Sequence, residues 1–396
     1  MRVRSPLSAA VFVLLCASAG LNIYALIRST AKDHSGTDFN QLYATGSMLR
    51  AGHGAELYDI NVQRRVQDNL FHRGYLPGNH PAYEYLLFAP LSLLPYRTAY
   101  FCFFAVNLIL LGFALWAICD QPSPANLLAM AVIAFSFFPL SMALFQGQDS
   151  ILLTATVAAG LLALKHNWRV SAGMLVGFGL FKFQLTIPIF LLLLLWKHWR
   201  FCLGFLLSGF TLAVLSVIIT GPAEQRLYLS LLAHTQTTSD ALRMVNLRAL
   251  CAAAIPRMSG ALLVGANLAI GAFLALVLSR SRRSNKEALL VAIPVATLCS
   301  YHLYSHDLTL LLLPITALLF QAELSPLEIA GAALLLTSPA ASPRGYLLVL
   351  PVGSFLWLFA TQKRCPPFHA PTESLATGER KSDSDAFCGG SHLRKV

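Results

Sequence analysis

Polar residues that a bundle of membrane helices would not need for packing occur in a few short stretches of this sequence. The first stretch begins at Thr37 and Asp38, directly after the first long apolar run. A carboxylate where a membrane span ends can take a proton from a polar substrate that arrives from the water. We therefore interpret Asp38 as the candidate catalytic base. Asp38 could instead cap the helix that follows, with Gln41 completing a capping box.

The second polar stretch is centred on Lys182, which interrupts an otherwise apolar run. A lysine in the middle of a span is costly unless it faces a cavity or the far interface, so we expect Lys182 to point to the far side; it could also snorkel there. More polar residues fall at the ends of other apolar runs, namely Gln146, Gln148, Asp149, Gln184, Asn246, Arg248, His302, His306 and Asp307. Each could be a loop end or a cap, but their gathering predicts a site.

Metal-binding patterns are weak. His302 and His306 stand four residues apart, a spacing that can bind zinc on one face of a helix, but the sequence has no second cluster of matching ligands. Asp38 also lacks the close second aspartate that often holds a divalent ion beside a phosphate. We therefore predict no metal and no cofactor, and an activity that survives chelation.

The elements that carry these residues must be membrane helices. Hydrophobic residues make up 56% of the 396 residues and charged residues only 12%, against about 25% in soluble domains. Several uncharged runs approach the ~20 residues that cross a bilayer as a helix, and they lack the alternation of a barrel strand. We predict an all-α polytopic membrane protein of about 10–12 membrane segments, with the lipid bilayer as a partner.

The net charge of +11 is spread over short connections between apolar runs. This is the positive-inside pattern, so we assign those connections to the cytoplasm and expect no nucleic acid partner. The first span is expected to remain as a signal anchor. The segments assigned to the far side are 29–96, 144–149, 221–257, 301–307 and 341–346. The candidate site residues are expected at or near that face, with Lys182 and Gln184 reaching it from the break in the run 170–196.

The largest extramembrane element is the loop 29–96. Helical spacing predicts an amphipathic interfacial helix over 39–49, a second helix over 61–73 and a re-entrant or interfacial segment over 83–94. Two short helices are expected to meet at Lys182. Residues 1–362 form the membrane domain, and the polar tail 363–396 is predicted to be a disordered cytoplasmic segment.

An ordered set of motifs resembles glycosyltransferase family 87. The motifs are Thr37-Asp38-Phe39, His80-Pro81, Leu86–Pro95, Phe145–Ser150, Gly179–Gln184, Asn246-Leu247-Arg248 and Ser300–Leu308, and the resemblance runs from about residue 38 to 320. Ala82 and Ala249 depart from the family pattern, where proline and glycine are common. The family consists of bacterial enzymes of the GT-C fold that use polyprenyl-phosphate sugars.

The resemblance implies that Asp38 is the catalytic base, assisted by His302 or His306. It implies transfer of mannose or a similar hexose to a glycolipid or glycan acceptor, by a multi-pass enzyme of the bacterial inner membrane whose site faces the periplasm. His80 and Asn246, which lie in its motifs, join the candidate substrate-binding residues.

The residues themselves support the same chemistry. Transfer from a lipid-linked sugar phosphate needs a base, cations for the phosphate and groups for sugar hydroxyls. Asp38 would be the base, and Lys182 with Arg248 would hold the phosphate. Amides suited to sugar hydroxyls are Gln146, Gln148 and Gln184. A lone carboxylate favours a single displacement with inversion.

A transporter or flippase of lipid-linked sugars is the alternative, because broken helices with polar groups also build transport sites. Alternating access predicts a site at the midplane between repeated halves, whereas the polar residues here gather toward one face. A purely structural membrane subunit would leave Lys182 unexplained.

Overall fold

A computed structural model describes residues 6–31, 37–71, 75–238, 241–255, 260–279, 284–320, 324–341 and 345–361. Residues up to Thr361 form one compact unit. Within the described ranges every regular element is a helix, which confirms the prediction of an all-α protein. The predicted tail 363–396 lies outside the described residues.

Four helical stretches are long and apolar enough to cross a membrane. They are α1 (Pro6–Thr30), α5 (Tyr96–Ile118), the stretch Arg169–Leu195, and α11 (Trp199–Thr238) up to Ala233. A fifth span results if α6 (Pro124–Ser136) and α7 (Phe138–Gln146), bent by 77° at their junction, count as one. A polytopic membrane protein is therefore confirmed.

The other helices are shorter. The apolar ones include α8 (Ser150–Lys165), α13 (Gly260–Ser279), α15 (Leu312–Leu319), α16 (Pro326–Ala341) and α17 (Val349–Thr361). The 3-10 turn η5 (Ser305–Leu311) leads directly into α15, and η6 (Gly345–Leu348) leads directly into α17. Two further helices in the second half of the chain are α12 (Leu247–Ala254) and α14 (Asn285–Cys299), with η4 (Ala241–Arg243) just before α12.

The stretch around Lys182 changes helix type without ending the span. The 3-10 turn η3 (Phe178–Lys182) joins α9 (Arg169–Gly177) to α10 (Phe183–Leu195). Two short helices do meet at Lys182 as expected, but together they form one apolar stretch of 27 residues.

Helices α9 and α11 cross at unusually short range because each has a glycine at the crossing. A Cβ on Gly173 would lie 1.9 Å from the Phe201 carbonyl oxygen, and a Cβ on Gly204 would lie 1.9 Å from that of Val170. Only glycine allows this mutual approach, a common way for membrane helices to pack. The crossing fixes η3, and with it Lys182, relative to α11.

We expect Gly204→Ala to destabilise the protein by about 1–3 kcal/mol, because the added methyl group overpacks a backbone contact. Thermal unfolding of the purified protein in detergent measures this loss. Gly112→Ala in α5 is the control, since a Cβ there meets nothing within 4 Å. Equal melting temperatures for the two variants would contradict the close crossing.

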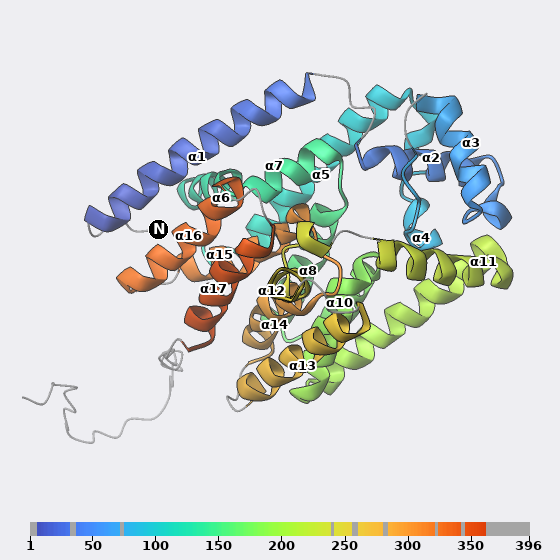
Figure 1. Cartoon of the computed structure of the whole chain (residues 1–396). Helices are drawn as coiled ribbons and strands as arrows, with labels where there is room; N and C mark the ends of the chain where they lie inside the picture. Colours follow the sequence, from blue (N-terminus) through green and yellow to red (C-terminus); the bar gives the residue numbers. More distant parts are fainter. Residues whose placement is uncertain are drawn as a thin grey trace, which may run out of the picture. The chain divides into compact units, whose positions relative to one another are not determined.

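The helices of the first loop gather beside α11 (Figure 1). They are α2 (Phe39–Arg50), α3 (Ile60–Phe71) and α4 (Ala82–Tyr85), with 3-10 turns η1 (Gly54–Glu56) and η2 (Leu91–Leu93). Nine of the twelve residues of α2 are buried, and the Phe39 ring lies against Phe88 and Phe103. The expected interfacial helix is therefore an interior one. The segment 83–94, expected to be re-entrant or interfacial, consists of most of α4, a run of turns and η2.

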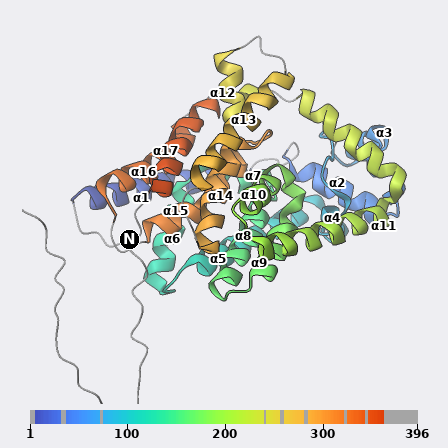
Figure 2. The ribbon, with the colours of Figure 1, turned by 90° about the horizontal axis from the view of Figure 1, so that it is seen from below.

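A sharp bend divides α11 into two arms (Figure 2). Gly221 adopts φ +81° and ψ 162° there, a conformation that favours glycine, and Pro222 follows it. Helix α11 contacts η1 and α4, and Glu224 lies in its second arm, beyond the bend. The backbone amide of Tyr58 donates to Glu224 Oε2 over 2.9 Å, which fastens this arm to the first loop.

Candidate active site

One pocket brings together most of the residues that the sequence singled out. Asp38, His80, Gln148, Lys182, Gln184, His302 and His306 all line it, from five separate segments of the chain. Further lining residues are Gln41, Leu76, Pro77, Asn79, Phe181, Phe183, Leu232, Tyr304 and Asp307. The pocket lies between the helices of the first loop and the ends of the membrane helices.

Asp38 stands at the start of α2 but does not cap it, because its side chain makes no capping hydrogen bond. Its Oδ2 instead accepts a hydrogen bond of 2.5 Å from Gln148 Nε2. The amide oxygen of Gln148 lies 3.4 Å from Lys182 Nζ. A lysine ammonium can only donate, so it holds the Gln148 oxygen toward itself and the Gln148 amide group toward Asp38. The predicted capping role of Asp38 is wrong.

Lys182 is buried and paired with two carboxylates. Its Nζ lies 2.7 Å from Asp149 Oδ1 and 2.8 Å from Asp307 Oδ1, and only 4% of the residue is exposed. A snorkelling lysine would keep its ammonium in water. The ion pairs therefore exclude the snorkelling interpretation and make Lys182 the centre of a buried charge network.

Asp307 is fixed by its neighbours as well. Ser150 Oγ donates to Asp307 Oδ1 over 2.9 Å, and the backbone amide of Tyr304 donates to Oδ2 over 3.2 Å. These bonds satisfy the carboxylate in a buried position. The start of η5 is thereby tied to the start of α8.

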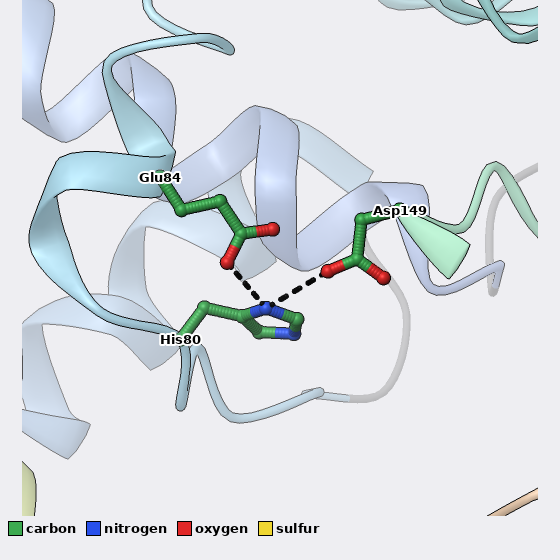
Figure 3. A group of neighbouring side chains, drawn as sticks. All are labelled: His80, Glu84 and Asp149. Carbon is green, nitrogen blue, oxygen red and sulfur yellow. Dashed lines mark hydrogen bonds and ion pairs between the residues drawn. The ribbon is translucent and has the colours of Figure 1, made fainter. Parts of the chain in front are cut away.

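His80 belongs to a second part of the network (Figure 3). Its Nδ1 lies 2.8 Å from Glu84 Oε2 and 3.3 Å from Asp149 Oδ2. Burial alone would lower the pKa of His80, but the Glu84 and Asp149 carboxylates outweigh it and raise this pKa to about 10. Burial also raises the pKa of Glu84 to about 8, against the opposing effect of His80. The imidazole is thus cationic at neutral pH.

The two late histidines differ. His306 Nδ1 lies 2.9 Å from the Gln146 amide oxygen, which can only accept, so Nδ1 carries the proton. Burial lowers the pKa of His302 to about 4, and its Nδ1 has no hydrogen-bond partner. His302 is therefore neutral at physiological pH and is a hydrogen-bonding group rather than a phosphate-binding cation.

Three predicted site residues support the pocket from behind. Asn246 Oδ1 caps α12 by accepting from the Ala249 amide, and its Nδ2 donates to the Ser300 carbonyl over 2.7 Å. Arg248 Nη1 donates to the Tyr301 carbonyl over 2.9 Å. These two side chains fix the segment that carries His302. The third, Gln146, contacts His306 instead of lining the pocket.

Two glutamines on α3 hold one wall of the pocket. Gln63 Nε2 donates to the Gly78 carbonyl over 3.1 Å while its Oε1 accepts from the Gly78 amide over 2.8 Å. Gln67 makes the same pair of bonds with Leu76, of 2.6 and 2.9 Å. The side chains thereby replace the backbone partners that a strand would have.

The comparison with family models decides the classification. The model described as glycosyltransferase family 87 matches residues 80–304, more than half of the chain. The chain belongs to glycosyltransferase family 87. No match was found among curated proteins or among solved structures. A membrane glycosyltransferase needs a sugar donor and an acceptor. The pocket that gathers most of the candidate site residues is the candidate place for them.

The family match does not cover every candidate. Asp38 precedes it, and His306 follows it. Their candidacy rests on the pocket that they share with the matched residues. Glu84 was not among the residues predicted from the sequence, although it lies four positions after His80 and this spacing could have revealed the pair. Asp149 and Asp307 were noted only as polar residues at the ends of apolar runs.

Proposed function

We propose that this glycosyltransferase moves a sugar, mannose or a similar hexose, from a polyprenyl-phosphate donor to a lipid or glycan acceptor. The observation that carries the proposal is the Asp38 carboxylate, oriented by Gln148 in a pocket that also holds the cationic groups Lys182 and His80. A base and cations in one pocket are what transfer from a sugar phosphate requires.

In the proposed reaction Asp38 takes the proton from the acceptor hydroxyl. The hydroxyl oxygen attacks the anomeric carbon, the bond between that carbon and the phosphate oxygen breaks, and polyprenyl phosphate leaves with the bonding electrons. A single displacement inverts the anomeric configuration. No metal or cofactor takes part, and neutral His302 with His306 would donate hydrogen bonds to the substrates.

The size of the pocket supports a lipid-linked donor. Its volume of about 210 Å³ is below the ~300–1,000 Å³ that usually encloses a whole small ligand. We infer that it takes the sugar phosphate and leaves the polyprenyl chain outside. The amide of Gln184 would contact sugar hydroxyls, Gln148 would orient Asp38, and Arg248, Asn246 and Gln146 would act by supporting the lining segments.

The test of the proposal is transfer by the purified enzyme. Radiolabelled mannosyl phosphoryl polyprenol is incubated with membrane glycolipid extracts, and products are separated and analysed by mass spectrometry. A new glycolipid is the expected result. Movement of the donor across vesicle membranes without any product would favour the alternative, a transporter or flippase.

The orientation of Asp38 can be tested through Gln148. We expect Gln148→Leu to lower kcat about tenfold to hundredfold with little change in donor binding, because the base loses its fixed direction. The control is Gln225→Leu, which removes an amide that bonds to Thr220 outside the pocket. A large rise in donor KM with unchanged kcat would assign Gln148 to substrate binding instead.

The side of the membrane is a further prediction. Basic connections assign the pocket to the periplasmic side of the bacterial inner membrane, so cysteines introduced at residues 60 and 240 should react with a membrane-impermeant reagent in intact cells. Cysteines at residues 167, 283 and 380 should react only after the cells are opened. Labelling of residue 60 only in opened cells would reverse the orientation.

A further inference from the structure

We propose that His80, held by Glu84 and Asp149, is the cation that receives the donor phosphate, and that Glu84 is the positioning residue that sets its charge. This inference rests on the proposed function. It assigns a phosphate subsite and gives a role to Glu84, a fully buried carboxylate that the transfer reaction does not use.

The geometry of His80 gives its two ring nitrogens different tasks. Nδ1 makes both contacts with the carboxylates, at 2.8 and 3.3 Å (Figure 3). The side chain is 13% exposed, and His80 lines the pocket. Nε2 makes neither of these contacts, and we assign it to the pocket side of the ring (Figure 3). A protonated imidazole then offers an N–H donor with positive charge, which suits a phosphate oxygen.

The backbone of His80 is fixed on both sides. Its amide donates to the Tyr85 hydroxyl over 3.0 Å, and its carbonyl accepts from the Tyr58 hydroxyl over 3.0 Å. The ring therefore enters the pocket from a rigid segment. Preorganised donors of this kind bind a charge without the cost of reorganisation.

Charge balance explains why Glu84 is needed. The charged groups that face His80 and its partners are Glu84 from α4, Asp149 from the start of α8, Lys182 from η3 and Asp307 from η5. Two cations and two ionised carboxylates cancel, which leaves one carboxyl to keep a proton. The raised pKa of Glu84, caused by burial, identifies Glu84 as that carboxyl.

A proton on Glu84 also accounts for an unsatisfied atom. Glu84 Oε1 is buried without a hydrogen-bond partner if it is treated as an ionised acceptor. A hydrogen bond between the side chains of Glu84 and Asp149 also contributes to the raised pKa of Glu84, so a protonated Glu84 can donate to Asp149. The phosphate then adds a negative charge beside His80.

Lys182 is less available for the phosphate than His80. Its Nζ already contacts Asp149, Asp307 and Gln148. Its positive charge raises the potential of the pocket, while His80 provides the direct bond. The two cations thus have separate roles in binding the donor.

The experiment measures binding of farnesyl phosphate and of farnesol to the purified full chain at pH 6.5 and 8.5. The wild type should prefer farnesyl phosphate at both pH values. His80→Gln should weaken binding of farnesyl phosphate about 10- to 100-fold and leave farnesol unchanged. Glu84→Gln should bind farnesyl phosphate like the wild type at pH 6.5, where Glu84 is protonated, but weakly at pH 8.5, because the variant lacks the ionised carboxylate that keeps His80 charged there.

Glu224→Gln is the matched control, since it changes another buried glutamate that fastens the same loop but lies outside the pocket. It should bind like the wild type. Equal binding of farnesyl phosphate by His80→Gln and wild type overturns the inference, as does a loss in Glu84→Gln that is the same at both pH values. A stoichiometric metal ion that disappears in Glu84→Gln would also overturn it, because the three side chains would then be ligands.

Failure of the proposed function gives a different result. If the wild type binds farnesyl phosphate and farnesol equally well, the proposal of a polyprenyl-phosphate donor is wrong, and the phosphate role of His80 is wrong as well. If the wild type prefers farnesyl phosphate and transfers sugar, and His80→Gln binds farnesyl phosphate equally well, only the role proposed for His80 is wrong.

Discussion

Asp38→Asn is expected to lower the rate of sugar transfer by about 10²- to 10⁴-fold, the usual contribution of a general base. Asparagine has nearly the same shape, and its side-chain oxygen can still accept the hydrogen bond from Gln148 Nε2. The substitution thus removes the proton acceptor and keeps the arrangement. Transfer is measured with purified enzyme, while donor binding is measured separately and should change little.

The matched control is Asp59→Asn in the same loop. Asp59 Oδ1 accepts from the backbone amides of Asn61 and Val62 at the start of α3, away from the pocket lining. That variant should keep near wild-type turnover. If Asp38→Asn also keeps more than a small fraction of turnover, the base must be sought among His302, His306 and Asp307.

Lys182→Met is expected to lower the free energy of unfolding by about 3–5 kcal/mol, because it leaves buried carboxylates without their cation. Both Asp149 and Asp307 contact Lys182 Nζ, at 2.7 and 2.8 Å, and both are buried. From the sequence alone, the substitution would be expected to weaken donor use and spare the fold. The ion pairs change that expectation, and thermal unfolding in detergent measures the difference.

Two further variants separate charge from packing. Lys286→Met makes the same replacement in a pair with Asp120, whose side chain is 73% exposed, and should cost at most about 1 kcal/mol. Adding Asp307→Asn to Lys182→Met should recover part of the lost stability, since one of the unpaired charges is removed. A double variant no more stable than Lys182→Met would mean that packing dominates.

Helix positions followed closely from the sequence because the lengths of apolar runs determine membrane helices. The uncharged run 98–119 of the sequence corresponds to α5 (Tyr96–Ile118), and the apolar run 150–164 corresponds to α8 (Ser150–Lys165). The burial of α2 could not be predicted in this way. Aromatic residues at helical spacing look the same on an interfacial helix and on an interior one, and two rings that pack against Phe39, those of Phe88 and Phe103, are remote from it in the sequence.

The candidate site was predictable as a set of residues but not as a network. Asp38 and Gln148 were recognised as polar residues near the ends of apolar runs and Lys182 as a charge inside one, and the three meet in one pocket. Which carboxylates pair with Lys182 depends on the crossing of helices that are remote in sequence. Glu84 was missed because it lies in a segment whose apolar character dominated its interpretation.

The glutamines of α3 have a consequence for how such a pocket diversifies. Gln63 and Gln67 hold Leu76 and Gly78 by their backbone groups, so the side chain of Leu76 can vary without loss of those bonds. Gly78 cannot vary in this way, because a Cβ there would lie 2.6 Å from Thr45 Oγ1. Conversely, a shift of α3 by a fraction of a turn would move the whole wall and change which sugar fits. Selection for a new acceptor can therefore act on a helix whose residues do not line the pocket at all.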